Sequence, residues 1–410
     1  MNNTPELLSP AGDLDKMRFG IAYGADAVYM AGTRFGMRAA ATNFDDNALR
    51  EGIAYAHAHG VKCYITVNIM PSNRDLPALP AYLELLQDAG ADALIIADVG
   101  VLRMARRYAP KVPVHISTQT SILNHEAANY WADEGAERIV LARELSLEEI
   151  AEIRAKTPKK LEIEAFVHGA MCISYSGRCL ISQYMTGRDA NHGACAQPCR
   201  WNYSLMEEKR PGQFFPVEED GRGTYLYNSK DMCMIEHVPE LIEAGITSFK
   251  IEGRNKTAYY AACVTGAYRA AIDTYKKDPE NFVLPQFCRD EVNKVSHREY
   301  YTGFYFGNQE NGQHYGDSQY IREYEVVGMP VECDDSGKAV FALKNRFFDG
   351  EELELIQPGQ APYVFRAENV TDDEGTKREL FNVPQMRVHF AFPFKVSEWA
   401  ILRKVKERPE

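Results

Sequence analysis

One pattern recurs through about the first 255 residues of the chain: a helical stretch that ends in glycine and leads into a short apolar run. A glycine after a helix supplies the left-handed residue that ends it, and an unbroken apolar run is typical of a strand covered on both faces. The pattern is found in YGADAVYM (23–30), HGVKCYITVN (59–68), AGADALIIAD (89–98), EGAERIVLA (134–142) and AGITSFKIEG (244–253). This rhythm predicts an array of βα units.

Further strands are expected at ELLS (6–9), VPVHIST (112–118), LEIEAFVHG (161–169) and TYLYNS (224–229). A capping box, Ser146 with Glu149, predicts a helix start. The nine strand candidates exceed by one the eight places of a TIM-like (β/α)8 barrel, yet this barrel explains the rhythm best. A doubly wound open sheet is the alternative, and no GxGxxG motif after the first strand supports it. We therefore expect an α/β fold with a barrel over residues 1–277.

The sequence changes character after this barrel region. A transition region rich in Tyr and Gly covers 278–319, and from 320 to 410 apolar and polar residues alternate between turn signals such as DDSG and DDEG. Such alternation is typical of strands with one buried face. We expect a small antiparallel C-terminal β domain, either a β-barrel or a sandwich.

Four of the nine cysteines, Cys172, Cys179, Cys195 and Cys199, fall in a Cys-rich insertion over residues 168–201. Packing does not explain such clustering, whereas four thiolates can surround a soft metal. The gaps of six, fifteen and three residues contain no CxxC zinc knuckle, which favours an iron–sulfur cluster over zinc. Because the insertion follows a strand, we expect it at the active face of the barrel.

Two disulfides or four ordinary thiols are the alternatives to a metal site. The N-terminus, MNNTPELLSPAG, lacks a signal-peptide pattern and so favours a reducing compartment, where disulfides are rare. Cys233 is a candidate spare ligand, and we expect the other cysteines to be structural.

Composition narrows the class of protein. With 410 residues, 45% of them hydrophobic and 25% charged, and no apolar run long enough to span a bilayer, we expect a cytoplasmic globular protein without membrane contact. The formal charge of −12 argues against a broadly positive surface for nucleic acid but permits a local basic patch. The candidate patches are Arg103, Arg106, Arg107 and Lys111; Lys156, Lys159 and Lys160; and Arg403, Lys404, Lys406 and Arg408.

Catalytic groups of such barrels lie at the carboxyl ends of the strands. The polar candidates there are Ser9, Asn68, Asp98, Ser117, Gln119, Arg143, Glu144, His168, Asn228, Lys230, Asp231, Lys250, Glu252 and Arg254. The segment KIEGR stands out because alternate residues of an extended chain share a face, so Lys250, Glu252 and Arg254 would place two cations around a carboxylate. That face suits a carboxylate-bearing ligand, and a structural ion-pair network is the alternative.

His168 precedes Cys172 by four residues. We expect it to act as an acid, a base or a hydrogen-bond donor to the cluster, with a purely structural histidine as the alternative.

Several of these segments resemble one known family. ELLSPAG (6–12), GADAVY (24–29), the run from FVHGAMCISYSGRCL through GACAQPCRW, NSKD (228–231) and KIEGR (250–254) are similar to the collagenase-like peptidase family, peptidase family U32. The resemblance is strong over about residues 1–275 and loose over the β tail. Within the family the chain most resembles the branch that uses prephenate to convert the wobble uridine of tRNA to 5-hydroxyuridine. Other branches hydroxylate ribosomal RNA or the ubiquinone ring, and the original label of the family is protease.

The resemblance implies a [4Fe–4S] cluster on Cys172, Cys179, Cys195 and Cys199, with tRNA and the dicarboxylate prephenate as partners. The residues to which we assign catalytic roles are His168, Lys250, Glu252 and Arg254, and those to which we assign substrate binding are Arg178, Lys230 and Asp231. A related subunit of the same family is a further candidate partner. Two other classes stay open: a peptidase that uses Cys172 with His168, and a binding scaffold with a redox-sensing cluster.

Overall fold

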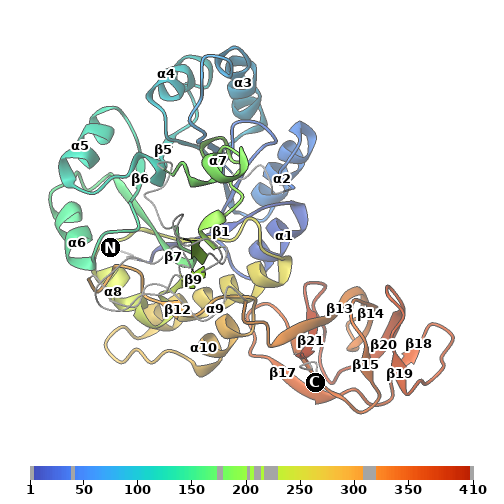
Figure 1. The fold of residues 1–410 in the computed structure, drawn as a ribbon. Coiled ribbons are helices and arrows are strands. Elements are labelled where there is room, and N and C mark those ends of the chain that lie inside the picture. Colours follow the sequence, from blue (N-terminus) through green and yellow to red (C-terminus); the bar gives the residue numbers. More distant parts are fainter. Residues whose placement is uncertain are drawn as a thin grey trace.

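The computed structural model describes residues 4–37, 42–172, 179–200, 204–206, 214–216, 230–307 and 320–406. Eight strands pair in parallel in the order β11-β1-β2-β3-β4-β5-β6-β7, and β7 pairs with β11 to close the ring (Figure 1). The strands are β1 (Glu6–Pro10), β2 (Ala27–Met30), β3 (Lys62–Val67), β4 (Ala93–Ile96), β5 (Val114–Ile116), β6 (Arg138–Val140), β7 (Glu162–Ala170) and β11 (Ser248–Ile251). The predicted TIM-like barrel is confirmed.

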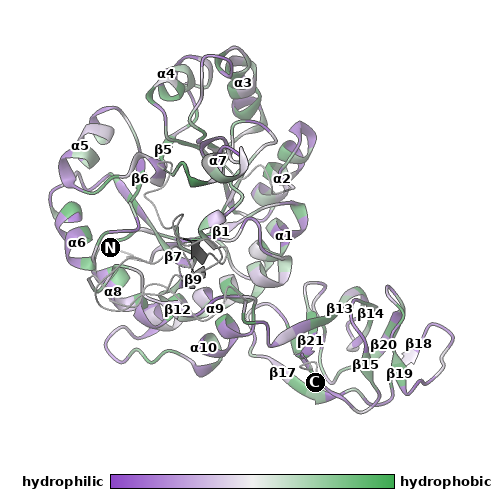
Figure 2. Cartoon of the chain, in the orientation of Figure 1, coloured by the Kyte–Doolittle hydropathy of each residue, from purple (hydrophilic) through white to green (hydrophobic). Residues whose placement is uncertain are grey.

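Helices alternate with these strands and surround the ring (Figure 1). They are α1 (Leu14–Ala22), α2 (Asp46–Ala58), α3 (Leu79–Ala89), α4 (Val99–Tyr108), α5 (His125–Asp133), α6 (Leu147–Ala155), α8 (Val238–Glu243) and α9 (Ala258–Lys277). Figure 2 shows them in mixed hydrophobic and hydrophilic colours, as expected for helices with one face on a core and the other toward solvent. No described helix is both long and apolar enough to cross a membrane.

The local signals read from the sequence recur in the structure. The glycine that follows each of the five repeated helical stretches has a positive φ, from 72° at Gly60 to 98° at Gly24. The capping box is formed: the Ser146 hydroxyl accepts from the Glu149 amide at 3.2 Å, and the Glu149 carboxylate accepts from the Ser146 amide at 2.7 Å. The ninth strand candidate, 224–229, lies outside the described residues, and the barrel closes without it.

The chain between β7 and β11 forms a long insertion. It holds α7 (Ile181–Thr186) and an antiparallel pair, β8 (Ser204–Met206) with β9 (Phe214–Pro216). Next, β10 (Asp231–Cys233) runs antiparallel to the end of β7 and also pairs with β12 (Tyr300–Tyr301). The insertion is therefore longer than the 168–201 segment expected from the cysteines.

The expected transition region packs on the barrel rather than linking two bodies. It contains α10 (Gln286–Asn293), which contacts α9. Cys288, Val292 and Tyr305 are buried in the same hydrophobic core as the barrel strands and helices. Its described part thus extends the first domain.

The C-terminal part is an antiparallel β domain with its own core, as predicted. Its main sheet has the order β17-β16-β21-β13-β14-β20-β18, and β15 pairs with β19. The strands are β13 (Tyr324–Cys333), β14 (Lys338–Leu343), β15 (Phe347–Phe348), β16 (Glu352–Ile356), β17 (Tyr363–Arg366), β18 (Thr371–Asp372), β19 (Leu380–Phe381), β20 (Arg387–Ala391) and β21 (Ile401–Val405). Figure 1 shows the domain as a separate lobe beside α9 and α10.

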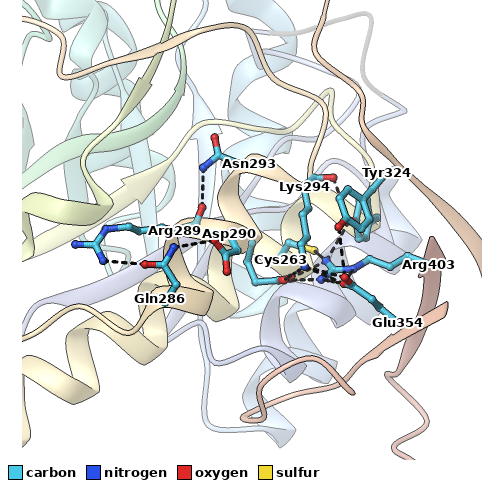
Figure 3. A network of polar contacts seen from close by, with 11 residues as sticks. Cys263, Gln286, Arg289, Asp290, Asn293, Lys294, Tyr324, Glu354 and Arg403 are labelled. Carbon is cyan, nitrogen blue, oxygen red and sulfur yellow. Dashed lines mark hydrogen bonds and ion pairs between the residues drawn. The ribbon is translucent and has the colours of Figure 1, made fainter. Parts of the chain in front are cut away.

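A buried ion-pair network joins the two domains (Figure 3). The Arg403 guanidinium on β21 is 0% exposed and donates to the Glu291 carboxylate of α10 at 2.6 Å and to Glu354 of β16 at 2.8 Å. Lys294 lies 2.9 Å from the Glu354 carboxylate. Lys404 is also buried and binds Glu351 at 2.8 Å. The interpretation of Arg403 and Lys404 as part of an exposed basic patch is therefore wrong, because both cations are neutralised inside the protein.

Replacing Arg403 tests this network. Arg403→Met should lower the free energy of unfolding by about 3 kcal/mol or more, because it leaves the Glu291 and Glu354 carboxylates buried without their main cation. The matched control is Lys395→Met, since Lys395 forms an exposed pair with Asp335 at 2.6 Å; we expect a change within about 0.5 kcal/mol for it. Urea denaturation measures both, and equal effects would contradict the assignment.

Candidate active site at the barrel mouth

The inside of the barrel holds a ladder of buried charges. Arg138 of β6 donates to the Glu6 carboxylate of β1 at 2.6 Å and to the Glu164 carboxylate of β7 at 3.0 Å. Glu164 is 0% exposed, and its other oxygen accepts from Nζ of Lys250 on β11 at 2.6 Å. Burial lowers the pKa of Lys250, and the Glu164 carboxylate opposes this shift. The ladder fixes Lys250 with its ammonium group inside the ring.

A cavity opens above this ladder, at the carboxyl ends of the strands. Both sequence features singled out for chemistry line it, namely Cys172, Cys179, Cys195, Cys199, Lys250, Glu252 and Arg254. The insertion contributes further lining residues, including Ile181, Ser182, Ala190, Asn191 and Pro198. The Met70 amide donates to the Asn191 carbonyl at 3.2 Å and ties the insertion to the segment after β3. The barrel and its insertion therefore build one site.

The four cysteines that line the cavity, Cys172, Cys179, Cys195 and Cys199, are free thiols rather than disulfides. The Gln197 amide donates to the Cys195 sulfur at 3.4 Å, and the Ala196 amide donates to the Ser182 hydroxyl at 3.0 Å, which ties this loop to α7. Among the described side chains, no three of His, Cys, Asp or Glu are gathered in the geometry of a metal site. Four cysteines nevertheless line one cavity, and four cysteine thiolates are the usual ligand set of an iron–sulfur cluster.

The side of the cavity lined by Lys250, Glu252 and Arg254, here called the KIEGR wall, carries two buried cations. Lys250 and Arg254 are each 4% exposed. The Lys250 ammonium lies 4.4 Å from the Tyr29 ring centroid, and the Arg254 guanidinium contacts the Met37 carbonyl and, at 3.5 Å, the Thr66 hydroxyl. Both residues and Glu252 line the cavity, although β11 ends at Ile251 and so does not itself include Glu252 and Arg254. The alternative, a structural ion pair, is also realised, by Lys250 with Glu164.

Polar residues that follow three other strands also line the cavity. Asn68 follows β3, Ser117 and Gln119 follow β5, and Arg143 follows β6. The Asn68 amide donates to the Ser117 hydroxyl at 3.3 Å, and the Arg143 guanidinium donates to the Ala170 carbonyl at 2.9 Å. These residues were strand-end candidates without assigned roles. Two other candidates lie elsewhere: Ser9 bonds Thr265 at 3.0 Å, and Asp98 caps α4.

Sequence reasoning missed several residues of the site. Tyr29, Thr66 and Phe166 line the cavity, but in sequence they look like ordinary residues of buried strands. Glu164, the buried partner of Lys250, carried a usable signal, since an acidic residue inside the strand LEIEAFVHG needs a buried cation.

His168 is not among the residues that line the cavity. It packs among tyrosine rings of α9 and β12, with ring centroids 5.6 Å from Tyr268 and 5.2 Å from Tyr300. The Tyr300 hydroxyl donates to the Val292 carbonyl, so its oxygen accepts from His168 Nε2 at 3.2 Å. Burial lowers the pKa of His168 to about 3. The described position gives it the structural role that was the alternative to acid, base or cluster donor.

The residues assigned to substrate binding are not in the described cavity lining. Lys230 and Asp231 lie where β10 begins, and β10 runs alongside the end of β7. There Lys230 pairs with Glu299 at 3.0 Å, and Asp231 accepts from the backbone N–H of Arg298 at 3.2 Å. Arg178 lies outside the described residues. Cys233, the candidate spare ligand, also lies on β10 outside the cavity lining, and burial raises its pKa to about 12.

Comparison with known proteins identifies relatives over nearly the whole chain. The model of peptidase family U32 matches residues 12–315, and that of the peptidase family U32 C-terminal domain matches 322–403. A protein named tRNA hydroxylation protein P1 from Bacillus subtilis is 39% identical over 98% of this chain and 95% of its own length. tRNA hydroxylation protein P of Escherichia coli is 37% identical over 90% of each chain. The 23S rRNA 5-hydroxycytidine C2501 synthase of Escherichia coli is 39% identical over 80% of this chain and 48% of its own length.

The burial of His168 predicts a pH dependence of stability. Its folded pKa of about 3 lies below the unfolded value of about 6.5, so the unfolded chain takes up a proton that the folded chain excludes, and stability falls as pH drops from about 6.5 toward 3. Between pH 7 and pH 4, the free energy of unfolding of His168→Gln should therefore fall by about 2–3 kcal/mol less than that of the parent protein.

Urea denaturation at the two pH values measures this difference. The control is His59→Gln, because His59 is exposed and should leave the pH dependence unchanged. If the free energy of unfolding falls equally in the parent protein and in His168→Gln, His168 is not buried as a neutral side chain.

Proposed function

The chain belongs to peptidase family U32, and we propose that within this family it acts in the hydroxylation of RNA, with tRNA as its substrate. The observation that carries this proposal is the alignment of nearly the whole chain with relatives named for tRNA hydroxylation. The relative named as a 23S rRNA 5-hydroxycytidine synthase supports the wider class of RNA hydroxylation.

In finer terms, we propose that the product is 5-hydroxyuridine at the wobble position and that prephenate is the small co-substrate. The two buried cations of the cavity support this choice, since Lys250 and Arg254 offer a point charge and a planar fork to a dicarboxylate. The Glu164 carboxylate accepts from Nζ of Lys250 at 2.6 Å, which holds this group in place inside the ring. The co-substrate would thus be oriented by groups that are fixed before it binds.

We further propose that Cys172, Cys179, Cys195 and Cys199 hold a [4Fe–4S] cluster. When bound, such a cluster supplies redox or Lewis-acid chemistry that side chains alone lack. The four thiols of the insertion line the same cavity as Lys250, Glu252 and Arg254, so a cluster held by them would lie near the proposed binding groups of the small acid.

The peptidase alternative finds less support in the described geometry. A cysteine nucleophile needs a base within hydrogen-bond reach. Nε2 of His168 bonds the Tyr300 hydroxyl, and its ring packs against α9 rather than lining the cavity that Cys172 lines. RNA hydroxylation therefore remains our conclusion.

Metal analysis tests the cluster. Anaerobically purified protein should contain about four iron and four acid-labile sulfide per chain. Cys195→Ala should lose most of this iron, whereas Cys233→Ala should retain it, because Cys233 does not line the cavity. Stoichiometric zinc without sulfide would contradict the cluster.

Analysis of tRNA nucleosides tests the reaction. Expression of the protein in a host that lacks its counterpart should restore nucleosides derived from 5-hydroxyuridine, detected by mass spectrometry, and blocking prephenate synthesis should abolish them. Arg254→Ala should lower the modification about a hundredfold with iron content unchanged, because it removes a buried charge-assisted contact. Arg387→Ala, which breaks an exposed pair with Glu332 in the C-terminal domain, is the control and should leave modification intact. A nucleoside profile unchanged by the parent protein would refute the proposed function.

A further inference from the structure

One buried polar group of the cavity has an unused hydrogen-bonding atom. Gln119 is 5% exposed and lines the cavity, and its side-chain oxygen Oε1 has no hydrogen-bond partner in the described structure. A buried amide oxygen without a donor is unfavourable, and folded proteins contain few of them. Such a group at the wall of a cavity therefore points to a ligand that donates a hydrogen bond.

The backbone around Gln119 is held firmly. Gln119 is the middle residue of a short 3₁₀ turn, Thr118–Thr120, directly after β5. The Thr118 hydroxyl donates to the Leu141 carbonyl at 2.9 Å, and the Thr120 hydroxyl donates to the Ser117 carbonyl at 2.9 Å. The amide oxygen is thus carried by a braced turn, as a specificity-determining group needs to be.

The neighbouring Ser117 offers the complementary hydrogen-bonding group. The Asn68 oxygen accepts from the Met37 amide at 3.2 Å, which orients its Nδ2 as the donor to the Ser117 hydroxyl. The backbone N–H of Gln119 also donates to this hydroxyl, at 3.4 Å. Because the Ser117 oxygen accepts twice, its own proton is left to donate. The β5 side of the cavity therefore presents a donor next to an acceptor.

We propose that Ser117 and Gln119 recognise the Watson–Crick edge of the pyrimidine that is to be hydroxylated. In uracil, N3–H would donate to the Gln119 oxygen, and the adjacent carbonyl O4 would accept from the Ser117 hydroxyl. Hydrogen bonds on that edge leave the C5–C6 bond of the ring on the side away from Gln119. This inference rests on the proposed function, because it assumes that an RNA base is the substrate.

Two planar groups on the same side of the cavity suit a flat ring. The Arg143 guanidinium lies 4.1 Å from the Phe166 ring centroid, and both residues line the cavity. Aromatic rings and guanidinium planes are surfaces on which proteins stack unpaired RNA bases. The base would then occupy the β5–β7 side of the cavity, next to Lys250, whose ammonium lies 5.4 Å from the Phe166 ring centroid.

Binding of two RNA stem-loops tests the inference. The first carries uridine at the wobble position, and the second carries 3-methyluridine there, which lacks the N3–H donor. With the parent protein, we expect the methyl group to weaken binding about tenfold. Gln119→Leu should bind the uridine stem-loop about tenfold more weakly than the parent protein and should show no further loss with 3-methyluridine.

The control variant is Gln286→Leu, which changes an exposed glutamine of α10 and should keep the full effect of the methyl group. Thermal denaturation checks that each variant is folded, and Gln119→Met replaces Gln119→Leu if the latter is not. A methyl effect that persists undiminished in the Gln119 variant would overturn the inference while the proposed function stands. Failure of the parent protein to bind either stem-loop would refute the proposed function and the inference together.

Discussion

The buried carboxylate of Glu164 is the interaction on which the site depends. It lies between Arg138 and Lys250 and so links β6, β7 and β11 inside the barrel. A charge with no exposure is tolerated only when its partners are in place, and these partners come together only when β7 pairs with β11 to close the ring. Closure of the fold and placement of the Lys250 ammonium are therefore one event.

The site combines residues of the long segment between β7 and β11 with residues of β11 and its continuation. The segment after β7 contributes the four cysteines to the cavity lining, and the chain from β11 onward contributes Lys250 and Arg254. Thiols and cations that are distant in sequence meet because β7 and β11 are neighbours in the ring. The polar residues after β3, β5 and β6, namely Asn68, Ser117, Gln119 and Arg143, supply a further set of contacts to the same cavity.

The C-terminal domain is coupled to this site through α9. That helix follows the KIEGR segment directly, and its Tyr259 hydroxyl accepts from the Arg403 guanidinium at 3.1 Å, within the network of Figure 3. Arg403 thus serves the domain interface, where it donates to Glu291 of α10, whereas Lys404 pairs with Glu351 inside the C-terminal domain. Arg103 and Arg107 of α4, from another of the candidate basic patches, are exposed.

The architecture could be predicted from the sequence, because its signals are local. Glycine caps, apolar runs and the Ser146 capping box specify βα units wherever they occur, and the clustered cysteines and the KIEGR segment, singled out in the sequence, both line the cavity. The grouping of these candidates in one cavity depends on long-range packing. His168 and Asp231 were expected in the site, but His168 of β7 packs against α9 and Asp231 pairs alongside the end of β7, and neither lines the cavity. Gln119, one strand-end candidate among many in the sequence, gained a role only from its neighbours, since an unused hydrogen-bonding atom is a property of the three-dimensional surroundings.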